Sequence, residues 1–125
     1  MEINAVVPVI RIFDVAKAKE FYIDWLEFKI DWEHRFNDHA PLYMQISKGN
    51  YSFHLSEHYG DGVPGIHIFL WCSGLEEYQQ KLLDKNYKYY HPELETTFYN
   101  TTCMNVIDPF GNKLSFNEKL NEDAE

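Results

Sequence analysis

The chain has 125 residues and a net charge of −9, and 17% of its residues are aromatic. This length predicts one domain with a real core, and the acidity argues against nucleic acid, which binds basic surfaces. Cys72 and Cys103 are too few for a disulfide framework or a cysteine zinc site, and no apolar run approaches the ~20 residues of a membrane span. We therefore expect a cytoplasmic protein with reduced thiols and neither a membrane nor a nucleic-acid partner.

The first half of the chain has the pattern of one helix and four strands. Asp14 is suited to cap a helix whose apolar residues recur at helical spacing and which ends near Glu27. β-branched or alternating apolar residues predict strands over 6–12, 28–33, 42–47 and 51–57, with a polar loop over 34–41.

The second half repeats this order after a stretch rich in glycine and proline. An apolar strand is predicted over 66–72, followed by a helix from Leu75 to about Asn86. Further strands are predicted over 87–90, 96–99, 102–107 and 113–117. Each half has one amphipathic helix and a small sheet, so neither half buries its apolar face well alone. The chain is predicted to be one α+β domain of two paired βαβββ modules, with module one at about 5–58, linker 59–65, module two at about 66–118 and acidic tail 119–125.

The segment that precedes the last strand has the composition of a tight turn. Asp108 and Pro109 can open it, because proline presets φ and the Asp side chain can bond nearby amides. Gly111 and Asn112 tolerate positive φ. In the strand that follows, Ser115 falls on the face opposite Leu114 and Phe116.

In order and spacing, these elements resemble the glyoxalase/bleomycin-resistance/dioxygenase superfamily, which has the vicinal oxygen chelate fold. The residues that carry the resemblance are 11–15, Phe21-Tyr22, 26–28, 54–58 and 108–112. The resemblance implies that each module curls into half of an open, cleft-bearing sheet and that the protein is a homodimer. Two departures stand out: Glu27, where many members have glycine, and Tyr99-Asn100-Thr101-Thr102, where close relatives often have Trp-Gly-x-Arg.

The resemblance also implies four positions for the ligands of one divalent metal, and they fall near Val7 and on His54, His67 and Ser115. Val7 has no donor and a neutral serine is a poor ligand, so we expect no metal or other cofactor and no catalysis. The alternative is a metal-dependent lyase, isomerase or dioxygenase of the glyoxalase type that uses His54 and His67. His67 can also be interpreted as a hydrogen-bonded core histidine.

The function implied by the resemblance is that of a bleomycin-resistance protein. Such a homodimer would sequester a flat, cationic small molecule, such as a bleomycin-like glycopeptide antibiotic, without converting it. Aromatic faces would stack on the ligand, while Asp31, Glu33, Glu57 or Asp61 would attract its amines. The predicted ligand-binding residues are Trp32, Phe36, His54, Glu57, His58, Tyr59, His67, Phe98, Tyr99 and Ser115. Each aromatic residue taken separately also fits core or interface packing, and the fold could serve another small molecule.

Overall fold

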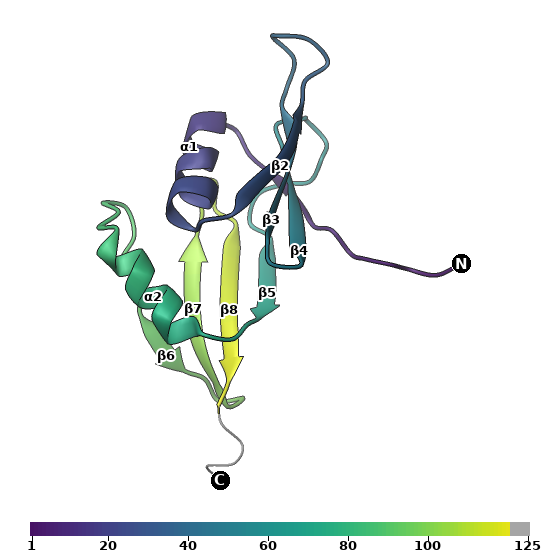
Figure 1. The fold of residues 1–125 in the computed structure, drawn as a ribbon. Coiled ribbons are helices and arrows are strands. Elements are labelled where there is room, and N and C mark those ends of the chain that lie inside the picture. The colour runs from purple at the N-terminus through teal and green to yellow at the C-terminus, as the bar shows by residue number, and fades with distance from the viewer. Residues whose placement is uncertain (121–125) are drawn as a thin grey trace. The chain divides into compact units, whose positions relative to one another are not determined.

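The computed structural model describes residues 1–120, and the chain divides into two compact units (Figure 1). The first unit contains Met1–Ile66 with Pro109–Gly111, and the second contains His67–Asp108 with the described residues from Asn112 to Leu120. Each unit is built around one four-stranded sheet. The predicted mixed α+β architecture of two βαβββ modules is confirmed.

Module one has the strand order β1-β4-β3-β2. Its strands are β1 (Val9–Arg11), β2 (Lys29–His34), β3 (Tyr43–Lys48) and β4 (Tyr51–Ser56), with β1 parallel to β4 and the other pairs antiparallel. The predicted strand over 6–12 is wrong in length, since β1 begins only after Pro8, which has no N–H to donate.

The helix of module one is α1 (Val15–Lys19), which continues as a π-helix, η1 (Glu20–Trp25). The Asp14 cap is confirmed, because its Oδ1 accepts a hydrogen bond from the Lys17 backbone N–H at 3.0 Å.

Module two repeats the topology with the order β5-β8-β7-β6, and again the outer pair, β5 and β8, is parallel. Its elements are β5 (His67–Trp71), α2 (Leu75–Asp84), β6 (Leu94–Thr96), β7 (Thr101–Ile107) and β8 (Lys113–Lys119). The strands predicted over 87–90 and 96–99 are wrong, and the single strand in this region is β6. β8 includes Lys119, the first residue of the predicted acidic tail, and residues 121–125 of that tail lie outside the described part.

The turn before β8 has the predicted form. The Asp108 carboxylate accepts hydrogen bonds from the backbone N–H of Asn112 at 2.9 Å and from its Nδ2 at 3.0 Å, and both residues are buried. Gly111 has a φ of 94°, which glycine adopts without steric cost. The turn therefore fixes the register in which β8 begins.

Alternation along the strands separates a buried face of each sheet from an open face. In module one, Met44, Phe53 and Leu55 are buried, whereas the side chains of Tyr43 and His54 lie on the opposite, open face. In β8, Ser115 lies on the face opposite Leu114 and Phe116, as predicted, but it is buried as they are. The open faces carry the polar and aromatic residues that can form a site.

Glu27 ends the first helix in a conformation that suits glycine better. Its φ is 67°, and the following N–H, that of Phe28, donates to the carbonyl of Tyr22 at 2.9 Å, as is typical of a left-handed helix end. This explains why many members of the superfamily that the sequence resembles have glycine at this position. Glu27 keeps the same geometry at a cost in backbone strain.

Replacing Glu27 with glycine should stabilise the protein, because the left-handed conformation costs a side-chain-bearing residue about 1 kcal/mol. We expect Glu27→Gly to raise the free energy of unfolding by about 1 kcal/mol in urea titration. Glu77→Gly, within α2, is the matched control and should lower it by about as much. A loss of stability in both variants would contradict the assignment of strain to Glu27.

Candidate functional site

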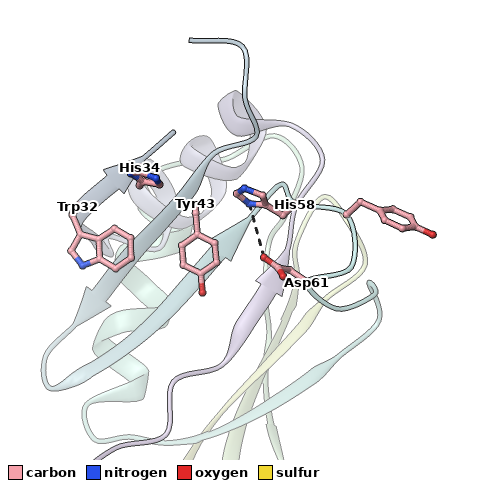
Figure 2. A pocket seen from close by; sticks show the side chains of 6 residues that line it. Trp32, His34, Tyr43, His58 and Asp61 are labelled. Carbon is pink, nitrogen blue, oxygen red and sulfur yellow. Dashed lines mark ion pairs between the residues drawn. The ribbon is translucent and has the colours of Figure 1, made fainter. Parts of the chain in front are cut away.

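A cavity of about 560 Å³ lies in module one (Figure 2). Its volume lies in the range that drug-sized ligands occupy. The residues that line it are Trp32, His34, Tyr43, His58, Tyr59 and Asp61. The cavity thus brings together three of the predicted ligand-binding residues, Trp32, His58 and Tyr59, and one of the predicted carboxylates, Asp61.

A β-bulge in β2 creates one wall of this cavity. The pairing of β2 with β3 shifts register between Ile30 and Trp32. As a result Asp31 and Trp32, which are adjacent in sequence, both face the side chains of β3: Asp31 accepts a hydrogen bond from Gln45 at 3.0 Å, and Trp32 stacks on Tyr43. Strict alternation, which the sequence predicted over 28–33, would have sent one of them to the buried face.

Trp32 and Tyr43 form an aromatic platform beside the cavity. Their rings are nearly parallel, 11° apart, with centroids separated by 6.0 Å. His54 packs edge-on against both rings, at 5.3 Å from Trp32 and 5.1 Å from Tyr43. Trp32 remains 42% exposed, so the platform is accessible to a ligand within this unit.

Asp61 supplies the negative charge of the cavity and is held in place. The Ser56 hydroxyl, which is fully buried, donates to Asp61 Oδ2 at 2.7 Å and accepts from the backbone N–H of His58 at 3.0 Å. His58 Nδ1 lies 4.0 Å from the same carboxylate oxygen, and Figure 2 marks this pair with a dashed line. The carboxylate therefore has a fixed orientation before any ligand arrives.

A chain of hydrogen bonds crosses the open face of module one. Gln45 Nε2 donates to Asp31 Oδ2 at 3.0 Å, His54 Nε2 lies 3.0 Å from Gln45 Oε1, and Tyr43 Oη lies 2.7 Å from His54 Nδ1. The bonds from Gln45 and then from Ser47 lower the pKa of Asp31, so its carboxylate is ionised and only accepts.

The direction of the whole chain follows from that carboxylate. Gln45 must present its NH₂ to Asp31, so its oxygen faces His54 and accepts from Nε2–H. His54 Nδ1 is then the acceptor for the Tyr43 hydroxyl. Burial, and next the charge of Asp61, raise the pKa of Tyr43, so this hydroxyl keeps its proton at neutral pH.

Module two has a chain of the same design. Asn105 Nδ2 donates to Glu95 Oε1 at 3.1 Å, Ser115 Oγ donates to Asn105 Oδ1, and His67 Nε2 lies 2.7 Å from Ser115 Oγ. Since Ser115 gives its proton to Asn105, it accepts from His67 Nε2–H. Ser115 is buried, but His67 is exposed on β5, so the interpretation of His67 as a core histidine is wrong although its hydrogen bond is real.

The remaining predicted residues lie away from the cavity lining. Phe36 is 88% exposed in the loop after β2. Glu57 braces that loop: its Oε1 accepts from the Leu42 backbone N–H at 2.9 Å and lies 3.9 Å from Arg35 Nη1. In module two, Phe98 is 97% exposed and packs edge-on against Tyr99.

Sequence analysis missed several residues of the site. They are His34, Tyr43, Gln45 and Ser56. Tyr43, Gln45 and Ser47, like His54 and Ser56, recur at every second position of strands whose intervening residues are buried and apolar. This alternation could have placed Tyr43, Gln45 and Ser56 on the open face, although it does not show which residues they contact.

The side chains at the family's metal positions do not fit a metal ion. Both ring nitrogens of His54 lie within hydrogen-bonding distance of protein partners, and His67 Nε2 is paired with Ser115. Val7 has no donor atom. Among residues 1–120, no group of three or more His, Cys, Asp or Glu side chains could hold a metal ion.

The two cysteines are free thiols, and burial, followed by the charge of Glu118, raises the pKa of Cys72 to about 11. Burial also raises the pKa of Cys103. Both thiols are therefore poor nucleophiles at neutral pH. Within the described part of the chain, neither helix has the length and apolar character needed to cross a membrane.

Comparison with known families identifies the class of this protein. The model of the family described as "Glyoxalase superfamily protein" matches residues 1–123. The chain therefore belongs to the glyoxalase/bleomycin resistance protein/dioxygenase superfamily, whose members have the vicinal oxygen chelate fold. No curated protein matches the sequence.

Solved structures share the fold at low sequence identity. A bleomycin resistance determinant encoded on the transposon Tn5 is 18% identical, with a TM-score of 0.71, and the match covers 95% of this chain and 100% of that one. TnmS3, an antibiotic binding protein from Streptomyces sp. CB03234, is 16% identical, with a TM-score of 0.70 and coverage of 96% and 100%. A superfamily member from Sphaerobacter thermophilus is 17% identical, with a TM-score of 0.65 and coverage of 92% and 98%.

The lowered pKa of Asp31 predicts a specific loss of stability in acid. Its contribution is complete above its ordinary pKa of 3.8 and is lost as the pH falls through the lower value in the folded protein. We therefore expect the free energy of unfolding of Asp31→Asn to fall less steeply than that of the wild type between about pH 5 and pH 2. Asp38→Asn, in the exposed loop, should keep the wild-type profile, and parallel profiles for all three proteins would refute the role of Asp31.

Proposed function

We propose that this protein is a homodimer that sequesters a flat, cationic small molecule, such as a bleomycin-like glycopeptide antibiotic, without converting it chemically. The observation that carries the proposal is the cavity of module one, where the Trp32–Tyr43 platform stands beside the fixed carboxylate of Asp61. A flat cation satisfies both features at once, since its plane stacks on the rings and its charge meets the carboxylate.

Two energetic contributions support the capture of a cation in this cavity. A cation over an aromatic face gains about 0.5–2 kcal/mol, and the bond between Ser56 and Asp61 removes the cost of ordering that carboxylate on binding. A cavity of about 560 Å³ accommodates the flat heteroaromatic part of a large glycopeptide rather than all of it. The net charge of −9 would also draw a cation toward the protein.

Binding without conversion is supported by the state of the two histidines. His54 and His67 are tied into the hydrogen-bond chains of their sheets, and the other two metal positions offer no strong donor. The relatives named for bleomycin resistance and antibiotic binding make a drug the first ligand to test.

The dimer is supported by exposed aromatic side chains on module two. Phe69, Trp71 and Tyr99 are each between 44% and 55% exposed. The ring of Phe69 packs against the rings of both Trp71 and Tyr99. Exposed aromatic clusters of this kind are typical of interfaces. The free thiols are consistent with the reducing cytoplasm as the place where it acts.

Titrating bleomycin into the purified protein should quench tryptophan fluorescence and release heat, with a dissociation constant in the micromolar range or tighter. Asp61→Asn should weaken binding by about tenfold, since it removes an ion-pair contact worth roughly 1.5 kcal/mol. Asp84→Asn, at the end of α2, is the matched control and should bind as the wild type does. If wild-type protein binds no drug at micromolar concentrations, the drug assignment fails.

Elemental analysis of protein purified without chelator tests the enzymatic alternative. We expect less than about 0.1 equivalents of Zn, Ni, Mn or Fe per chain, because catalytic sites of this kind normally keep three protein ligands. One tightly held ion per chain that is lost in the His54→Ala or His67→Ala variant would instead favour a metal-dependent lyase, isomerase or dioxygenase.

A further inference from the structure

The hydroxyl of Tyr43 donates its hydrogen to His54, so it can only accept a hydrogen bond from any other group. The hydrogen bonds that start at the ionised carboxylate of Asp31 continue through Gln45 to His54. They leave His54 Nδ1 as the acceptor of the Tyr43 hydroxyl, and Oη lies 2.7 Å from Nδ1. A phenolic oxygen has a single hydrogen to donate. Any ligand group in the cavity that reaches Tyr43 Oη therefore finds only a hydrogen-bond acceptor there.

Asp61 is likewise able only to accept hydrogen bonds from a ligand. Its Oδ2 already accepts from the Ser56 hydroxyl, and an ionised carboxylate has further lone pairs on both oxygens but no hydrogen. Figure 2 shows Tyr43 between Trp32 and the His58–Asp61 pair, and both side chains line the same cavity.

We propose that the cavity of module one selects its ligand by hydrogen-bond direction, and takes flat cations that carry N–H donors in preference to equally flat, equally charged cations that carry none. This inference rests on the proposed function and specifies the ligand class. The donor class includes amidinium, aminoheteroaromatic and primary or secondary ammonium groups. Tyr43 Oη is the specificity-determining acceptor, and Gln45 and His54 are positioning residues that fix its direction.

A matched pair of dyes tests this inference. Proflavine is a flat monocation with ring and amino N–H groups, and 3,6-bis(dimethylamino)-10-methylacridinium has the same ring and charge but no N–H. In fluorescence titrations at pH 7, we expect the wild type to bind proflavine about tenfold more tightly than the methylated dye. Tyr43→Phe, which keeps the ring, should weaken proflavine binding by about three- to tenfold and change the methylated dye by less than about twofold.

Tyr51→Phe is the matched control, because Tyr51 is exposed on β4 and does not line the cavity; it should leave both affinities unchanged. Equal weakening of both dyes in Tyr43→Phe, or an equal affinity of the wild type for both, would overturn the selection by donors while leaving the binding function in place. Binding of neither dye at micromolar concentrations would overturn the proposed function and this inference together.

A measurement without any ligand tests the direction of the chain. Long-range ¹H–¹⁵N NMR of the neutral form of the His54 imidazole should show the proton on Nε2 and none on Nδ1. The same spectrum of Gln45→Leu should lose this preference for one tautomer, since the acceptor for Nε2–H is removed. A proton on Nδ1 in the wild type would overturn the inference whatever the dyes do.

Discussion

The open face of this protein depends on a carboxylate at the edge of a sheet that accepts from an amide on the next strand. In module one, Asp31 accepts from the NH₂ of Gln45. This orients the amide and, through it, the ring of His54 and the hydroxyl of Tyr43. An amide alone can face either way, and an imidazole has two neutral tautomers. Because the ionised carboxylate can only accept, it fixes both the orientation of the Gln45 amide and the tautomer of His54. It thereby also fixes the direction of the hydrogen bond between Tyr43 and His54.

The same arrangement recurs in module two, where Glu95, Asn105 and Ser115 stand for Asp31, Gln45 and His54. The strand registers agree as well, since Gln45 pairs with His54 across β3 and β4 as Asn105 pairs with Ser115 across β7 and β8. The two halves show little repeated sequence, but they repeat the order acid, amide, terminal group. The two modules therefore share the order of their hydrogen-bonding groups, although the residues that supply these groups differ.

Sequence reasoning succeeded where a local rule decides the outcome. The Asp14 cap, the helix of module two, the turn at Asp108 and the alternation of β8 all follow from side chains within a few residues. It failed where distant parts of the chain decide. The bulge at Asp31 depends on pairing with β3, and Tyr43 becomes a site residue only because His54, eleven positions later, lies beside it. Periodicity carries no information about such cross-strand partners.

The bulge in β2 affects the side chains of the cavity wall but not the topology of the sheet. It is one extra residue in an edge strand, and deleting one residue there would restore regular pairing and preserve the sheet. The same deletion would remove either the carboxylate of Asp31 or the indole of Trp32 from the open face, because regular pairing leaves room for only one of them there. One residue gained or lost in β2 therefore changes which side chains stand on the open face, while the order and pairing of the strands stay the same.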